Sequence, residues 1–223
     1  SGINERVTAL VVQPDGRIFL GGRFFAGGAW PYSRIARLRT DGSADVTGTD
    51  AFRPVQMDAP GTEVLTLALQ PNGRILAGGT FTAVAGQTRF YLARFLANGD
   101  LDPGFDPAPG DPVYSLAVQP DGQILAGGDF ARIAGRNVRG LARLTSSGAV
   151  DGGWRPPGFD DRVAALALTA DGRVLAGGSF TQPHSGIVRL NGAAEPGVSA
   201  GGPQFRVLKP GRSALITSPT STA

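Results

Sequence analysis

A four-fold internal repeat constrains the fold of this chain more than any other feature of its sequence. Each copy contains an Asp-Gly or Asn-Gly dipeptide, a glycine pair that starts five residues after the glycine of the dipeptide, and a phenylalanine two residues beyond that pair. The dipeptides start at Asp15, Asn72, Asp121 and Asp171, and the phenylalanines are Phe24, Phe81, Phe130 and Phe180. Landmarks in fixed order at a period of about 50 residues indicate tandem copies of one small structural unit.

Each copy predicts a meander of short strands. Apolar, β-branched segments precede the dipeptides and predict first strands at Val7–Val12, Val64–Leu69, Val113–Val118 and Val163–Leu168. Pro presets φ for the turn that follows in most copies, and Asp-Gly or Asn-Gly supplies the positive φ that a hairpin needs. Second strands are predicted at Arg17–Leu20, Arg74–Ala77, Gln123–Ala126 and Arg173–Ala176, each closed by the glycine pair. Third strands are predicted around Arg37, Arg94, Arg143 and Arg189, and a short fourth strand near Phe52, Phe105 and Trp154.

The repeat and the composition together predict a fold class. The chain has 34 Gly and 17 Pro among 41% hydrophobic residues, which favours short strands joined by tight turns. One such sheet cannot bury both of its faces, so the copies must pack on each other, and radial packing of small antiparallel sheets produces a β-propeller. We therefore predict an all-β propeller of four repeats of about 50 residues, each a blade of three or four antiparallel strands.

The predicted repeats span approximately residues 3–62, 63–111, 112–161 and 162–190. Residues 191–223 then have two interpretations. They complete the last blade, or they begin a further domain that is truncated in this chain. Strand-like stretches at 205–208 and 214–217 are compatible with the first interpretation.

The repeat resembles that of the delta-60 family, bacterial repeats predicted to form β-propellers, and more loosely that of kelch propellers. The segments Val12–Ile18 and Val118–Gly128 carry the nearest match, and the resemblance extends from about Ile3 to Leu190. It implies large exported or surface-attached bacterial proteins, mostly of unknown activity, and it carries over no catalytic residues. The expectation of an extracellular or cell-surface location rests on this resemblance alone, because the chain has no signal-like apolar segment at its start.

An arginine in the predicted third strand is followed, eight residues later, by an aspartate in three of the four copies. The pairs are Arg37 with Asp45, Arg94 with Asp102, and Arg143 with Asp151. A guanidinium within an apolar strand needs a partner, and a carboxylate accepts two of its hydrogen bonds. We interpret the pairs as structural, repeated once per blade. The alternative is a ring of arginines that binds a ligand.

The connections between the second and third strands differ most between copies, and in a propeller they gather on one face. Loops on a rigid scaffold commonly carry function, and aromatic and arginine side chains are typical interface anchors. We therefore predict that this face binds a protein or a glycan. The candidate residues are Trp30, Tyr32, Arg89, Phe90, Tyr91, Arg132, Arg136, Asn137, Arg139 and His184.

Other functions have less support in the sequence. A single histidine and the absence of cysteine leave no catalytic constellation and no ordinary zinc site, so we predict a noncatalytic protein without a cofactor. The aspartates of one loop keep a weak calcium alternative open against ordinary turn chemistry: Asp100, Asp102, Asp106 and Asp111. Two further alternatives are a polysaccharide-active enzyme that uses aspartates on one face, and a repeat fragment whose open blade edges self-associate into a larger ring.

The distribution of charge excludes two classes of partner. The net charge is +3, and the 21 basic and 18 acidic residues are interspersed rather than clustered, which disfavours nucleic-acid binding. No apolar stretch approaches the 18 or so residues that a membrane-spanning helix requires, so we expect no membrane insertion.

Overall fold

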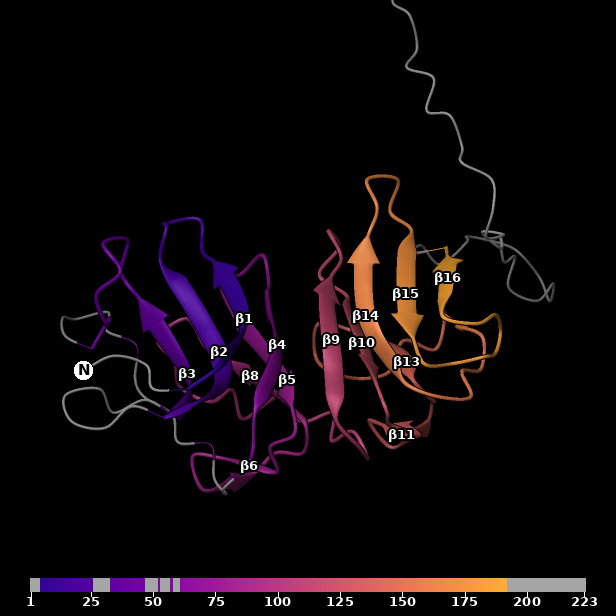
Figure 1. Ribbon diagram of the computed structural model, residues 1–223, viewed down its shortest axis with the longest axis horizontal. Helices are drawn as coiled ribbons and strands as arrows, with labels where there is room; N and C mark the ends of the chain where they lie inside the picture. The colour runs from indigo at the N-terminus through magenta and orange to yellow at the C-terminus, as the bar shows by residue number, and fades with distance from the viewer. Residues whose placement is uncertain (1–4, 26–32, 47–51, 53–56, 58–60, 192–223) are drawn as a thin grey trace, which may run out of the picture.

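The chain forms four antiparallel sheets in sequence order, one from each repeat, as predicted (Figure 1). The computed structural model describes residues 5–25, 33–46, 52, 57 and 61–191. Trp30, Tyr32 and residues 192–223 therefore lie outside the described residues. The described part of the chain has no helix of the length and hydropathy needed to cross a bilayer.

Each blade has three strands. The strands of the first two blades are β1 (Val7–Val12), β2 (Ile18–Phe25) and β3 (Ser33–Leu38), then β4 (Val64–Leu69), β5 (Ile75–Gly79) and β8 (Leu92–Phe95). Those of the last two are β9 (Val113–Val118), β10 (Ile124–Gly128) and β13 (Leu141–Leu144), then β14 (Val163–Leu168), β15 (Val174–Gly178) and β16 (Ile187–Leu190). Two small hairpins lie between the second and third strands of the middle blades: β6 (Ala83–Val84) with β7 (Gln87–Thr88), and β11 (Arg132–Ile133) with β12 (Arg136–Asn137).

The hairpin turns follow the predicted chemistry. In blade 3, Gly122 has φ of 84°, a left-handed conformation that glycine adopts without steric cost. The Asp121 carboxylate accepts a hydrogen bond of 3.0 Å from the Gln123 N–H, and the Gly122 N–H donates to the Gln119 carbonyl at 2.9 Å. These bonds fix the turn, and with it the register of β9 against β10.

The glycine pair belongs to the second strand, which therefore ends later than predicted; the pair closes the strand in blades 2, 3 and 4, whereas β2 of blade 1 continues to Phe25. Gly78 and Gly79 both pair with β4. A Cβ atom on Gly78 would lie 2.8 Å from Val113 Cγ1 of the next blade, and one on Gly79 would lie 2.0 Å from the Glu63 carbonyl oxygen. The pair is therefore needed because neighbouring chain segments pass too close for any side chain.

The predicted fourth strand is wrong at Phe105 and Trp154, which lie in loops. Only single bridges extend the third strands there, Phe95 to Leu101 and Leu144 to Val150. The proline-rich sequence that follows provides few amide donors for a ladder. Phe105 and Trp154 instead fill the core of their blades.

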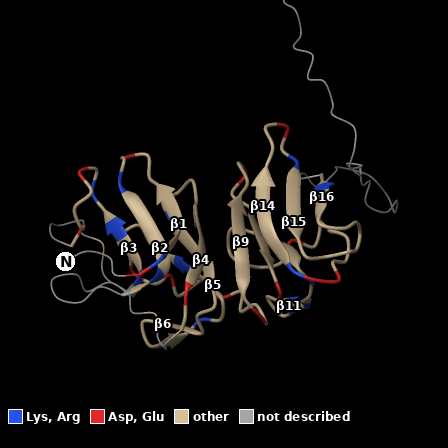
Figure 2. Ribbon diagram, in the orientation of Figure 1, with Lys and Arg blue, Asp and Glu red and all other residues tan. Residues whose placement is uncertain are grey.

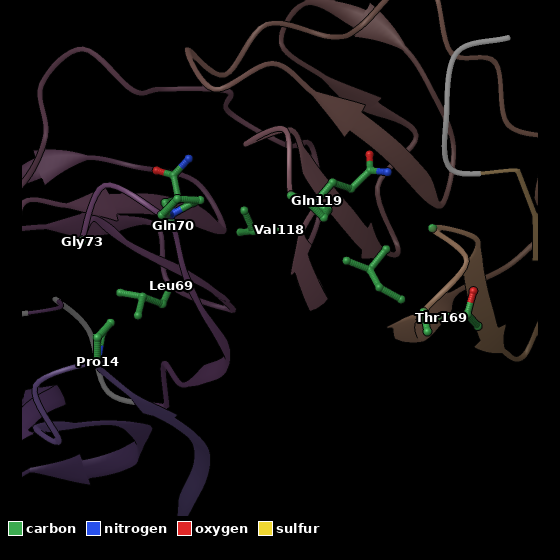
Figure 3. A pocket seen from close by; sticks show the side chains of 12 residues that line it. Pro14, Leu69, Gln70, Gly73, Val118, Gln119 and Thr169 are labelled. Carbon is green, nitrogen blue, oxygen red and sulfur yellow. The ribbon is translucent and has the colours of Figure 1, made fainter.

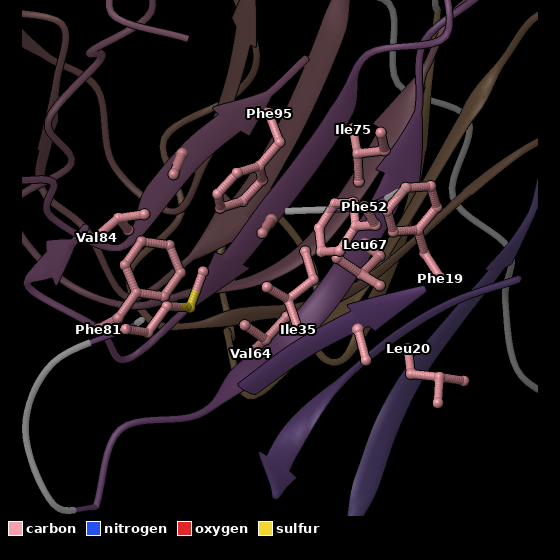
Figure 4. Packing of buried hydrophobic residues seen from close by; sticks show 14 of the residues in the cluster. Phe19, Leu20, Ile35, Phe52, Val64, Leu67, Ile75, Phe81, Val84 and Phe95 are labelled. Atoms are coloured by element: carbon pink, nitrogen blue, oxygen red, sulfur yellow. The ribbon is translucent and has the colours of Figure 1, made fainter. Parts of the chain in front are cut away.

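The core is shared between blades. The first cluster joins blades 1 and 2 and includes Phe19, Phe52, Val64 and Phe95 (Figure 4). The four phenylalanines that mark the repeat are all buried, as expected for residues that recur at one place in the unit. Burial of a phenylalanine side chain contributes about 1.5–3 kcal/mol, so these positions are major sources of stability in each blade.

The innermost strands β1, β4, β9 and β14 pack against each other in sequence order, and the blades fan out from them (Figure 1). Among the described strands, β1 packs on β2 and β4, and β14 packs on β9, β10 and β15. The first and last innermost strands thus have a neighbouring blade on one side only. The four blades form an open arc.

Candidate functional site

The arc has two faces, one at each end of the strands, and they are formed by different connections. The turns between the first and second strands lie at the upper end in Figure 1, and the hairpins β6–β7 and β11–β12 lie at the lower end. We call the first the turn face and the second the loop face. The predicted binding residues that the structure describes belong to the loop face.

The structure brings the three predicted Arg–Asp pairs together. Arg94 Nε lies 2.9 Å from Asp102 Oδ2, and the corresponding atoms are 2.7 Å apart in the Arg37–Asp45 pair and 2.9 Å apart in the Arg143–Asp151 pair. The three arginines are between 1% and 4% exposed. Arginines in a ligand-binding ring would need accessible guanidinium groups, so this burial favours the structural interpretation.

Each pair is completed by an aromatic ring and, in two blades, by the next blade. The Arg94 guanidinium lies 4.3 Å from the Phe105 ring centroid, and that of Arg143 lies 5.2 Å from the Trp154 ring. Arg37 Nη1 donates to the Ala97 carbonyl of blade 2 at 2.8 Å, and Arg94 Nη1 donates to the Ser146 carbonyl of blade 3. These arginines therefore hold their own loop and the neighbouring blade at the same time.

Two of the predicted binding residues pack within the loop face and stabilise it, and so are not fully exposed at its surface. Arg89 is buried, donates from Nη1 to the Thr88 carbonyl at 2.7 Å, and has Nη1 3.6 Å from Asp106 Oδ2. Tyr91 has φ of 59° and packs, half-buried, against the core of blades 2 and 3. His184 is half-buried, while Phe90 remains exposed.

The other predicted loop residues gather on one hairpin. Arg132, Arg136 and Asn137 belong to β11 and β12, Arg139 follows two residues later, and all four are exposed. Within the described residues, none of these three arginines forms a side-chain ion pair or hydrogen bond. Figure 2 shows basic residues at the lower edge of blade 3, beside the label of β11.

A second polar cluster on the loop side was not predicted. Asp129, just after the glycine pair of blade 3, accepts hydrogen bonds from the Tyr114 hydroxyl at 3.0 Å and from Arg162 Nε at 2.9 Å. The Arg162 guanidinium also lies 4.5 Å from the Tyr114 ring centroid. Burial, and then the hydrogen bond to Asp129, raises the pKa of Tyr114. Because Arg162 belongs to blade 4, the cluster joins two blades.

A cavity of about 420 Å³ lies on the turn face, opposite the predicted residues (Figure 3). It is formed where the turns of all four repeats converge, and prolines and aliphatic side chains dominate its wall. The lining residues include Pro14, Leu69, Gln70, Val118, Gln119 and Thr169. Sequence reasoning missed this cavity because it examined the variable loops, whereas the cavity is lined by the constant turns.

The four aspartates considered for calcium do not converge. Asp102 pairs with Arg94, Asp106 is near Arg89, and Asp100 accepts from Asn98 Nδ2 at 2.9 Å. Asp111 is exposed. In the described ranges no group of three or more His, Asp or Glu side chains is arranged to hold a metal ion.

Comparison with solved structures supports the propeller architecture. An extracellular domain of a one-component system from B. thetaiotaomicron has a TM-score of 0.50 at 13% identity, over 83% of this chain and 21% of that one. A protein of unknown function from Bacteroides caccae also has a TM-score of 0.50, at 15% identity, over 83% of this chain and 63% of that one. This chain thus spans less than two thirds of either neighbour. Identities this low show likeness of fold alone.

Family comparison is more specific. No curated protein sequence matches the chain. The model of a β-propeller repeat family matches residues 13–47, 70–105, 119–153 and 169–192, one segment in each blade and together more than half of the chain. The chain therefore belongs to the family described as Domain of unknown function (DUF5122) beta-propeller.

Proposed function

We propose that this chain is a noncatalytic binding module that holds an anionic partner on its loop face. The observation that carries the proposal is the group of exposed arginines on and beside the β11–β12 hairpin: Arg132, Arg136 and Arg139. An exposed guanidinium without an internal partner is available to form bidentate hydrogen bonds with a carboxylate. The partner is thus a carboxylate-bearing glycan or an acidic protein segment.

The hairpin is held rigidly, which favours binding. Ala134 and Gly135 form its two-residue turn with φ of 48° and 72°. The Ala134 N–H donates to the Pro107 carbonyl, and the Gly110 N–H donates to the Arg132 carbonyl at 2.9 Å. These bonds fasten the hairpin to the preceding loop, so less conformational entropy is lost when a partner binds.

Two aspartates of the loop face, Asp129 and Asp160, favour binding over catalysis. Asp129 is held by Tyr114 and Arg162, and Asp160 accepts the N–H groups of Thr181 and Gln182. The bond from Gln182, followed by the Thr181 hydroxyl, lowers the pKa of Asp160 to about 2. A general acid near neutral pH needs the opposite shift. These arrangements support the noncatalytic reading against a polysaccharide-active enzyme.

We further propose that the module acts outside the cell, as part of a larger exported protein with delta-60-like repeats. The sequence resemblance described above supports this location. One structural neighbour is also an extracellular domain. The short span of this chain relative to that neighbour is compatible with a module in a longer protein.

Affinity electrophoresis in gels containing polygalacturonate, with neutral dextran gels for comparison, tests the proposal. We expect retardation by polygalacturonate alone, weakening with added salt because exposed charges are screened. The variant Arg136→Gln with Arg139→Gln should lose about tenfold or more in affinity, since each charge-assisted hydrogen bond contributes about 1.5–3 kcal/mol.

The β6–β7 hairpin of blade 2 offers a matched control. Gln87 and Thr88 are exposed at the positions of Arg136 and Asn137. Gln87→Ala with Thr88→Ala should leave retardation unchanged. Equal retardation in dextran, or unchanged affinity in the double arginine variant, would contradict the proposal. An array of acidic peptides then distinguishes a protein partner from a glycan.

A further inference from the structure

The three contacts between adjacent blades are built in the same way. In each, the first glycine of the pair in one blade accommodates a valine from the innermost strand of the next, and Gly21 and Gly127 accommodate a leucine as well. A Cβ on Gly21 would lie 2.6 Å from Val64 Cγ1 and 3.1 Å from Leu67 Cγ. At the contact between blades 3 and 4, the corresponding distances from Gly127 are 2.9 Å to Val163 and 3.3 Å to Leu166. The space left by the missing glycine side chain is a recess, and the side chains of the next blade fill it.

Among the described residues, nothing from another blade enters this recess in the last blade. A Cβ on Gly177 would meet only atoms of its own blade, the Gly186 carbonyl oxygen at 3.7 Å and Ala165 Cβ at 4.0 Å. Ala164, Ala165 and Ala167 of β14 are exposed as well. Among the described residues, no valine or leucine side chain packs on Gly177 as Val163 packs on Gly127.

The first blade presents the matching groups without a recess to receive them. Val7 and Leu10 are 37% and 64% exposed. Their counterparts in blade 2, Val64 and Leu67, are 0% and 7% exposed. The difference arises because, among the described strands, β1 packs on its own blade and on blade 2 alone, so the side chains that fill a glycine recess elsewhere face solvent here.

The arginines of the third strands also connect one blade to the next. Arg37 donates to the carbonyl of Ala97, three residues after Arg94, and Arg94 donates to the carbonyl of Ser146, three residues after Arg143. Arg189 occupies this position in blade 4, and its side chain makes no hydrogen bond or ion pair within the described residues. Thr40 lies three residues after Arg37, so its carbonyl is the equivalent acceptor in blade 1. Thr40 is exposed.

We propose that the open end of blade 4 receives blade 1 of a second copy of this chain. In this junction Val7 and Leu10 of one copy pack against Gly177 of the other, and Arg189 donates to the Thr40 carbonyl. The two ends complement each other because each is half of a contact that the chain already makes, the glycine–valine packing at three junctions and the arginine–carbonyl bond at two. The inference does not depend on the partner proposed for the loop face.

Two copies also give a permitted blade number. Propellers close with about four to eight blades, and four blades leave this arc open. Eight, supplied by two copies, is the next multiple of four in that range. A two-fold axis then forms both junctions at once and removes both open edges.

Sedimentation equilibrium across a range of protein concentrations tests the proposal. We expect a mass of about twice the 22.9 kDa of the chain at high concentration. Gly177→Leu fills the recess of blade 4, and Leu10→Glu places a charge on the exposed face of blade 1. Each variant alone should remain at the monomer mass, with unchanged circular dichroism.

A mixture of the two variants provides the sharpest readout. The Gly177→Leu copy keeps an intact blade 1 and the Leu10→Glu copy keeps an intact recess, so one junction can form between them. We expect association in the mixture although neither variant self-associates. Phe90→Glu, an exposed change on the loop face, is the control and should preserve the doubled mass. A monomer mass for the unmodified chain at every concentration, or a doubled mass that survives both variants, would overturn the proposal.

Discussion

A buried guanidinium is stable only while its compensating groups remain in place, and blades 1, 2 and 3 of this protein each contain such a group. Burial lowers the pKa of Arg94, and the hydrogen bond and charge of Asp102 oppose that shift. The Phe105 ring covers the guanidinium at 4.3 Å and excludes water from it. The side chain therefore stays charged but has exchanged its hydration for three protein contacts.

Removal of the carboxylate should be costly. We expect Asp102→Ala to destabilise the protein by about 3–5 kcal/mol, because it leaves the Arg94 charge buried without its counter-ion. Urea denaturation followed by circular dichroism measures the change. Asp111→Ala, an exposed change nine residues along, should stay within about 0.5 kcal/mol. Similar losses in the two variants would contradict the structural role of the pair.

Asp160 offers a pH-dependent test at the same scale. Its pKa is lowered from 3.8 to about 2 by the Gln182 N–H first and the Thr181 hydroxyl next. A lowered folded-state pKa contributes stability that is present above pH 3.8 and is lost as the pH falls from 3.8 towards 2. The unmodified chain should thus melt at a higher temperature than Asp160→Asn near pH 6, with a difference that shrinks between pH 4 and pH 2. A difference that is constant with pH would rule out this linkage.

At the scale of elements, the glycine pair determines how closely the blades approach. A methyl group on Gly78 would lie 2.8 Å from both Thr66 Cγ2 and Val113 Cγ1. Neither neighbour can withdraw without disturbing β4 or β9. The pair is therefore a packing requirement of the contact between blades.

We expect Gly78→Ala to destabilise the protein by about 1–3 kcal/mol, the usual cost of overpacking a core. Gly152→Ala is the matched control, since a Cβ there has no neighbour within 4 Å. Thermal unfolding of both variants measures the difference. Equal melting temperatures would show that the blades can separate to admit a methyl group.

Much of each blade was predictable from the sequence, because alternation of apolar residues and Asp-Gly turns are local signals. The first strands agree with the predicted bounds in all four repeats. The hairpins β6–β7 and β11–β12 were not predicted, since strands of two residues have no periodicity and their turns use Ala-Gly. The pairing of Gly78 and Gly79 with β4 was also not predictable, because the sequence does not distinguish a glycine inside a strand from one that follows its end.

The candidate sites were less predictable than the strands. The spacing of eight residues pointed to the Arg–Asp pairs because the two partners flank one turn. Asp129 and Arg162 are 33 residues apart and meet only because two blades pack together. The cavity of the turn face likewise needs all four repeats in place. Contacts between units follow from the arrangement of the blades, which the repeat pattern alone does not specify.

At the scale of the whole molecule, the open arc makes the blades unequal. Blades 2 and 3 have a neighbour on each side, whereas blades 1 and 4 have one each. In a linear array of units, stability comes from each unit and from its contacts with nearest neighbours. The outer blades therefore have fewer stabilising contacts than the inner ones.

Hydrogen exchange should reveal this inequality. In dilute solution we expect slower amide exchange in β5 and β10 than in β2 and β15, because local opening is easier where a flanking blade is missing. At concentrations where two copies associate, protection of β2 and β15 should rise towards that of the inner blades. Uniform protection at every dilution would show that the arc opens as one cooperative unit.

The bonds from Arg37 and Arg94 to the following blade also bear on how such chains diverge. Arg37 and Arg94 reach carbonyl groups, which every amino acid provides, so the acceptor tolerates any substitution. Duplication or loss of a whole repeat leaves each of these arginines with a carbonyl acceptor in the blade that follows. Gain or loss of part of a repeat leaves a buried charge without one. Lineages of these proteins should therefore differ by whole blades, with the number of blades changing freely while the unit itself stays intact.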